Sequence, residues 1–173
     1  MAFDIATQTG VAFGPAGGTP RAVSVDLGKG LLEAQKFSRM LRLVDDFLTR
    51  HEPDLVVYEA AIGGASSNQY LIGLVACLRG GAFKHGLDPK AVYLAGVRKH
   101  FIGKNLTAKD FPGLGSYAAK KEIKRVVVSR CRSLGWDVED DNEADACAAW
   151  DYACATMAGV QARPGGLFDA ARA

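Results

Sequence analysis

The run Leu-Val-Val-Tyr-Glu at positions 55–59 constrains the fold more than any other segment of this chain. A short and almost wholly apolar run of this kind is typical of a strand that is buried on both faces of a sheet. The run ends in Glu59, and a carboxylate at the edge of a buried strand is costly unless it is paired or binds a metal. These five residues therefore predict a central strand with a chemically unusual end.

The segments around this strand predict a mixed α/β domain. Residues 3–14 read as a β-hairpin around a Thr-Gly turn, with Asp4 on its first strand. Apolar residues at helical spacing predict an amphipathic helix over 30–51, which Pro53 stops. The other expected elements are a strand over 21–27, a helix over 70–83, a strand over 91–94, a long Gly/Pro/Lys loop over 103–116, and helices over 120–134 and 143–157.

The length of 173 residues suits a single domain with one sizeable core. We expect residues 1–160 to form it and residues 161–173 to be a disordered tail. The longest apolar runs, such as 71–78, are far shorter than the roughly 20 residues of a membrane span, and no secretory signal opens the chain. We therefore expect a cytoplasmic protein without a membrane segment. Its four cysteines form no C-x-x-C pair, which favours reduced core thiols over zinc or disulfides.

Charge is unevenly distributed along the chain, although the net charge is only +2. Residues 98–132 hold ten Lys and Arg against two acids, and residues 135–151 hold seven acids and no Lys or Arg. A basic block followed directly by an acidic block suits a polyanion binder with a metal site beside it. A solvated helix face next to an acidic loop explains the same charges equally well.

Three carboxylates stand at positions that need an explanation. Asp4 lies in an apolar opening strand, Glu59 ends a buried strand, and Asp145 lies in the first turns of an Ala-rich helix, with Asp141 one turn earlier. Carboxylates that converge from strand ends and a helix face can bind Mg²⁺, which prefers oxygen ligands. Each also has a structural explanation, as a turn-initiating Asp4, an exposed Glu59 past its strand, or an N-capping Asp141.

The order of these motifs resembles RuvC-type Holliday junction resolvases, and looks closest to phage-like members of that family. The resemblance covers roughly residues 3–155. It is carried by D-x-x-x-x-T-G from Asp4, by the apolar strand that ends in Glu59, by Lys-x-x-Ile-x-x-Val-Val from Lys120, and by N-E-A-D-A at 142–146.

The resemblance implies an RNase H-like fold, with a central mixed β-sheet flanked by helices, and a homodimer. It implies an endonuclease that cleaves Holliday junctions or other branched DNA and leaves 5′-phosphate ends, with two Mg²⁺ or Mn²⁺ ions per active site. Matched by motif, Asp4, Glu59 and Asp145 would be metal ligands and catalytic residues. Lys120 would be the basic catalytic residue near the metals, with Lys121 as the neighbouring candidate.

The chain departs from the family pattern at Asn142. The family's other helix carboxylate lies three residues before the last one, and here that position is an amide. Asp141 can replace it as ligand and catalytic residue, because residues four apart share a helix face. Asn142 can also be a weak ligand itself, so the fourth ligand stays open between these two. Only three residues precede Asp4, which leaves a short first strand.

The resemblance also assigns the DNA-contacting residues. Ile62, in the loop after Glu59, lies where the family places a side chain that wedges against an unpaired base. The basic block would grip phosphates in a salt-sensitive and largely sequence-independent way. The expected DNA-binding residues are Ile62, Arg98, Lys99, Lys104, Lys109, Lys120, Lys121 and Lys124.

Three other functions compete with this interpretation. A YqgF-like RNA-processing nuclease has the same fold, and a non-catalytic junction-binding protein would account for the loss of an acid at Asn142. A sugar-kinase or actin-like ATP-binding fold also starts with an Asp before a Thr-Gly hairpin. That fold needs two such lobes, and the chain holds no second D-x-x-x-x-T-G.

Overall fold

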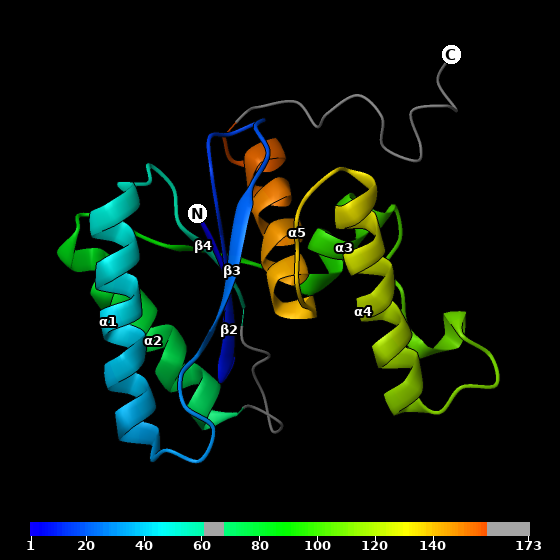
Figure 1. Cartoon of the computed structure of the whole chain (residues 1–173), viewed down its shortest axis with the longest axis horizontal. Helices are drawn as coiled ribbons and strands as arrows, with labels where there is room; N and C mark the ends of the chain where they lie inside the picture. The colour runs from blue at the N-terminus through cyan, green and yellow to red at the C-terminus, as the bar shows by residue number, and fades with distance from the viewer. Residues whose placement is uncertain (61–67, 159–173) are drawn as a thin grey trace.

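A computed structural model describes residues 1–60 and 68–158 of the chain (Figure 1). Its elements follow in the order β1 (Ala2–Asp4), β2 (Gln8–Phe13), β3 (Arg21–Asp26), α1 (Glu33–His51), β4 (Val57–Glu59), α2 (Gln69–Lys84), β5 (Lys90–Val92), α3 (Leu94–Ile102), the 3₁₀ turn Ala108–Asp110, α4 (Ser116–Ser133) and α5 (Asp141–Thr156).

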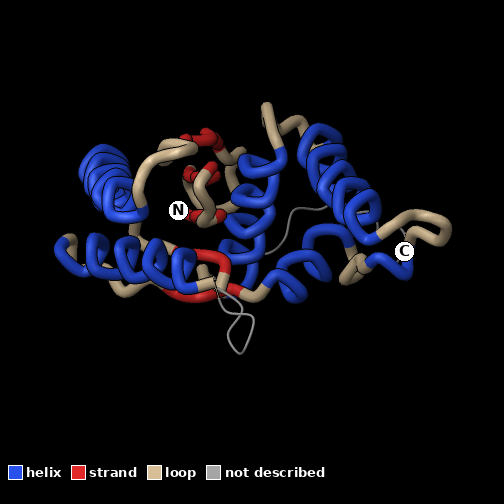
Figure 2. The backbone as a smooth tube through the Cα atoms, turned by 90° about the horizontal axis from the view of Figure 1, so that it is seen from below, coloured by secondary structure: helices blue, strands red, loops and turns tan. Residues whose placement is uncertain are grey.

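The five strands form one mixed sheet in the order β3-β2-β1-β4-β5. β1, β2 and β3 pair antiparallel, whereas β4 runs parallel to both β1 and β5. Helices α1 and α2 cover one face, and α5 covers the other with α3 and α4 beyond it (Figures 1 and 2). The sequence prediction of an α/β domain with a mixed sheet flanked by helices is therefore confirmed.

Side-chain alternation along the central strands fixes which residues face which helix layer. Phe3 and Tyr58 point into the core under α1 and α2, whereas Ala2 and Val57 point into the core under α5. Because the side-chain period of a strand is two residues, Asp4 and Glu59 belong to the α5 side, as Ala2 and Val57 do. The strand register thus aims both carboxylates at the helix that carries Asp145.

Helix α5 packs close to the sheet, and most of its buried residues are small. Ala144, Ala146 and Ala148 are buried, and α5 contacts β1 and β2. Gly10 on β2 allows the closest approach: a Cβ atom there would lie 2.0 Å from the backbone oxygen of Asn142. Gly10 pairs with Asp4 across the hairpin. The glycine therefore brings the first turn of α5 against the strand pair that bears Asp4.

The structure corrects the sequence analysis between β5 and α4. Leu94, expected at the end of a strand, begins helix α3, which was not predicted and which carries Arg98. The expected loop over 103–116 contains a 3₁₀ turn, and α4 begins at Ser116, so that Lys120 lies inside the helix instead of opening it. Ile62 and the tail expected over 161–173 fall outside the described residues. In the described segments, no helix combines the length and apolar character that crossing a bilayer requires.

Candidate active site

Asp4 and Glu59 end two neighbouring parallel strands. The β1–β4 register pairs Phe3 with Tyr58, so the two carboxylates follow at adjacent positions on the same edge of the sheet. Desolvation raises the pKa of Asp4 well above its usual value, and the charges of Asp145 and Glu59 raise it further. Two strand ends thus bring together acids that repel one another when ionised.

Asp145 approaches this pair from the second turn of α5. Its side chain is only 12% exposed. Burial raises the pKa of Asp145 to about 6, although the charges of Lys124 and Arg98 oppose the shift. Burial and the charge of Asp145 also raise the pKa of Glu59. The three acids therefore form one electrostatically coupled group.

Lys124 on α4 supplies the positive charge nearest to the helix acids. Its ammonium donates a hydrogen bond to Asp141 and lies 4.0 Å from a carboxylate oxygen of Asp145. Burial on its own would lower the pKa of Lys124, but the hydrogen bond to Asp141 and the charges of Asp145 and Asp4 raise it. From the sequence, Lys124 is expected on the DNA-binding surface and Lys120 near the acids. The structure places Lys124 at Asp141 and Asp145, and Lys120 in a groove that Glu59 also lines.

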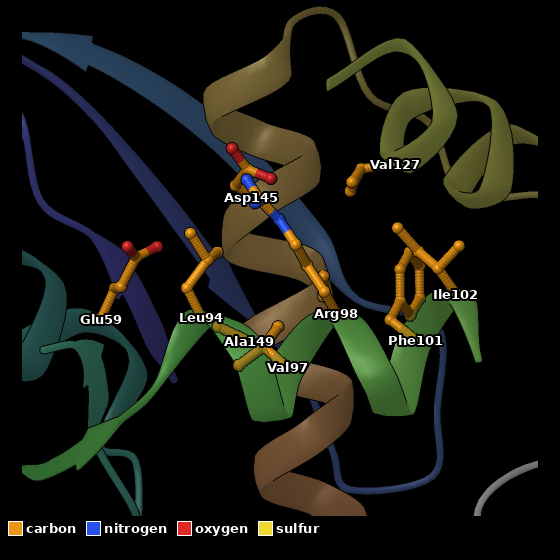
Figure 3. Close-up of a pocket in the computed structure, with 10 residues that line it drawn as sticks. Glu59, Leu94, Val97, Arg98, Phe101, Ile102, Val127, Asp145 and Ala149 are labelled. Carbon is orange, nitrogen blue, oxygen red and sulfur yellow. The ribbon is translucent and has the colours of Figure 1, made fainter. Parts of the chain in front are cut away.

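Arg98 approaches the acids from α3. Its side chain extends toward the carboxylate of Asp145, with Glu59 on the other side of Leu94 (Figure 3). These side chains line a small cavity of about 10 Å³, about the space of one water molecule. The Nε atom of Arg98 is buried and has no hydrogen-bond partner among the described residues. Arg98 therefore presents a partly unsatisfied cation beside two carboxylates.

The remaining polar residues of the α5 N-terminus have structural roles. Asp140, not Asp141, caps the helix, because its side chain accepts hydrogen bonds from the backbone N–H groups of Asn142 and Glu143. The amide of Asn142 donates to Asp140, at 3.3 Å between nitrogen and oxygen. Glu143 is buried and accepts a hydrogen bond from the backbone N–H of Glu139. Asp141 is thus left free of the cap and pairs with Lys124.

Two open grooves lie along α4, one at its start and one along its middle and C-terminal half, and together they hold most of the predicted basic residues. One, of about 410 Å³, has Lys121, Lys124 and Arg125 on one wall and Asp140 and Asp141 on the other. The second, of about 580 Å³, lies between α3 and the start of α4 and is lined by Glu59, Arg98 and Lys120, among others. Lys99, Lys104 and Lys109 are exposed outside both grooves, and Lys104 pairs with Asp110 at 3.0 Å.

The donor set fits a hard divalent cation in its chemistry, because a positive charge would relieve the repulsion among three partly buried carboxylates. The positions of these carboxylates, however, do not form a complete coordination site. Within residues 1–60 and 68–158, no group of three or more His, Cys, Asp or Glu side chains is arranged so that it could hold a metal ion. The Lys124 ammonium lies between Asp141 and Asp145 instead.

No protein-family model matches the chain, and no curated protein matches it. Solved structures do. RuvC of Thermus thermophilus is 19% identical with a TM-score of 0.64, and the match covers 91% of this chain and 95% of that one. RuvC of T. thermophilus in complex with a Holliday junction substrate is 18% identical with a TM-score of 0.63, over 91% and 92% of the two chains. At these identities the likeness establishes the fold, and the chain has a RuvC-like, RNase H-type fold.

Proposed function

We propose that this protein is a metal-dependent endonuclease of the RuvC kind, with residues 1–160 as its catalytic domain and phage-like members as its nearest counterparts. It would cleave Holliday junctions or related branched DNA. One observation carries the proposal: acids from β1, β4 and α5 meet at one edge of a RuvC-like sheet, next to the cations of Lys124 and Arg98. Burying coupled acids is costly, and a metal site is the simplest reason to keep them.

The carboxylates would hold two divalent ions, Mg²⁺ or Mn²⁺. Asp4 would contribute to both, Glu59 to one, and Asp145 with Asp141 or Asn142 to the other. Bound ions would supply Lewis-acid activation of the attacking water and stabilisation of the departing 3′ oxygen, which leaves a 5′ phosphate. Binding requires Asp141 and Asp145 to exchange Lys124 for an ion, because the ammonium pairs with them otherwise.

Lys120 and Arg98 would act on the scissile phosphate. Both line the groove that contains Glu59, and a cation fixed beside a phosphodiester stabilises the charge that develops during in-line displacement. Lys124, once released from Asp141, would lie at the same centre. The chain would therefore present positive groups on both sides of α4 to the cleaved strand.

The two basic grooves and the exposed Lys99, Lys104 and Lys109 would bind the DNA backbone. Neutralisation of several phosphates makes binding salt-sensitive and largely independent of sequence. We also propose a homodimer, because a C2 dimer places two active sites on opposing strands of a near two-fold junction. Helix α2 buries one face in the core and leaves Ile72 and Phe83 exposed at 46% and 77%, which suits contact with a second copy.

A second candidate is a junction-binding protein without catalytic activity. Asn142 hydrogen-bonds to the capping Asp140, and Lys124 already neutralises Asp141, so half of the cluster has no need of an ion. Cleavage of matched branched DNA, linear DNA and RNA substrates, with Mg²⁺ or Mn²⁺ and with EDTA, separates these functions. Metal-dependent nicking of branched DNA supports the nuclease, tight binding without cutting supports the second candidate, and cutting of RNA alone contradicts both.

A further inference from the structure

The larger of the two grooves is lined mostly by residues that have no part in the proposed metal chemistry. It has a volume of about 580 Å³, within the range of small-molecule sites, and lies between α3, the segment that follows α3, and the first turns of α4. Only Glu59 of the acid cluster lines it. The cluster and the groove are therefore neighbours that share one residue.

The walls of the groove combine apolar surface with an aromatic ring. Leu106 and Ile123 are nearly fully buried and line it, so that apolar surface forms its inner part. Tyr93 also lines it but is 73% exposed, which places this ring at the rim. A side chain this exposed contributes little to the packing of the core, so the fold does not account for a tyrosine at this position. An aromatic ring over an apolar floor is a surface on which a nucleic-acid base stacks.

Polar and charged groups complete the groove. Asn105 and Ser116 add uncharged hydrogen-bonding groups of the kind that contact base edges. Arg98 and Lys120 add two cations, and the buried Nε of Arg98 has no partner among the described residues. Positive charge beside apolar surface in one groove is complementary to a nucleotide, whose phosphate is anionic and whose base is flat and largely apolar on its faces.

We propose that this groove binds one unpaired nucleotide of the cleaved strand, next to the scissile phosphate. The base would lie on Leu106 and Ile123 with Tyr93 stacked against it, and its phosphate would face Arg98 and Lys120. This deepens the proposed nuclease function and rests on it. A base inside a duplex is stacked and paired, so it must leave the helix to enter. The groove would thus favour branch points, where unpaired nucleotides are cheapest to expose.

The test measures junction affinity with Ca²⁺ in place of the catalytic ion, on four-way junctions with one abasic nucleotide at successive positions. Ala95→Trp fills the groove from an exposed position on α3, and Tyr93→Ala removes the ring. Ala34→Trp, at an exposed position on α1, is the matched control. Thermal melting of each variant verifies that it folds.

Wild type and Ala34→Trp should lose about tenfold in affinity when the abasic nucleotide is next to the cleaved bond, as expected for one stacked base. Ala95→Trp and Tyr93→Ala should bind the intact junction about tenfold more weakly and lose nothing further at that position. Equal weakening of intact and abasic junctions would mean that the groove holds backbone or a protein segment, and would overturn the proposal. Wild-type affinity that is the same for the intact junction and for every abasic junction would also overturn the proposal. Absence of junction binding altogether would instead refute the proposed function, and the groove proposal with it.

Discussion

The ammonium of Lys124 on α4 is hydrogen-bonded to Asp141, the first residue of α5, and lies 4.0 Å from Asp145 one turn later. The ion pair joins the two helices that meet at the acid cluster. Asp141 and Asp145 are four residues apart and share a helix face, so one cation serves both. Lys124 therefore neutralises the half of the cluster that lies next to Asn142.

The lysine should compete with a divalent ion for Asp141 and Asp145. In Lys124→Gln, we expect the weaker of two Mn²⁺ sites to bind at least about tenfold more tightly than in wild type, because no ammonium has to be displaced. Calorimetric titration of the metal-free protein measures this. Lys121→Gln, which removes an exposed charge on the same helix, should leave the affinity within about twofold. Unchanged Mn²⁺ binding in Lys124→Gln would contradict the competition.

Asp145 should destabilise the metal-free fold at neutral pH. Its pKa is about 6 in the folded protein against a usual 3.8, so the folded state binds the proton more tightly than the unfolded state. Stability is then lost as pH rises from about 4 through 6. Asp145→Asn should raise the free energy of unfolding at pH 8 by about 1–3 kcal/mol, given about 1.4 kcal/mol per pKa unit.

Urea unfolding with EDTA at pH 4.5 and pH 8 tests this. The gain from Asp145→Asn should shrink to about a third at the lower pH, because Asp145 is then mostly protonated in the folded protein. Because the substitution also removes the charge interaction with Lys124, the gain at pH 8 should not exceed the upper end of this range. Asp137→Asn, at an exposed carboxylate outside the cluster, should change stability little at either pH. A destabilised Asp145→Asn at pH 8 would show that the acid is held by its cationic neighbours and not strained by burial.

Gly10 should be needed for the approach of α5. A methyl group at this position would lie 2.0 Å from the backbone oxygen of Asn142, so Gly10→Ala must push the helix start away from the sheet. We expect destabilisation of about 1–3 kcal/mol, as for other overpacked sites, together with weaker Mn²⁺ binding. Gly80→Ala, where a Cβ meets nothing within 4 Å in an exposed part of α2, should be neutral or stabilising. Equal effects of the two substitutions would refute the close packing.

The local parts of this site follow from sequence, and the parts that depend on packing do not. The apolar run ending in Glu59 and the apolar residues around Asp4 predict the two strand ends, because side-chain alternation acts within a few positions. The expected turn at Thr9-Gly10 is wrong, since both residues lie within β2 and the chain turns before them. Helix α3 was missed because its short run follows β5 directly and contains Gly96. Placing Arg98 near Asp145 depends on that helix.

The pairing of Lys124 with Asp141 was also beyond sequence reasoning. Lys120 and Lys124 share the same helix face, and only the packing of α4 against α5 decides which one pairs with Asp141. The role of Gly10 was equally hidden, because its conformation is ordinary and its requirement comes from Asn142 across the interface. The D-x-x-x-x-T-G motif contains this glycine, but the Thr-Gly pair predicts a turn and not a close contact with a helix.

Exposed apolar residues on α2 should mark the dimer contact. Phe83→Glu should convert the proposed dimer to a monomer, because a charge in an apolar interface is costly to desolvate. The substitution should change the stability of each folded chain little, since Phe83 is 77% exposed within one chain. Sedimentation of wild type and variant measures the change. A wild-type monomer at every concentration, or a dimer that survives the substitution, would exclude this surface.

Cleavage of a synthetic four-way junction beside its linear duplex tests the central claim most directly. The parent and Asp145→Asn would be compared with Mg²⁺, Mn²⁺ or EDTA, with the ends of the products determined. We expect paired, symmetric nicks on the junction alone, with 5′ phosphates, and loss of these nicks in EDTA and in Asp145→Asn. A junction that is bound tightly but not cut with either metal, or nicks that persist in Asp145→Asn, would contradict it.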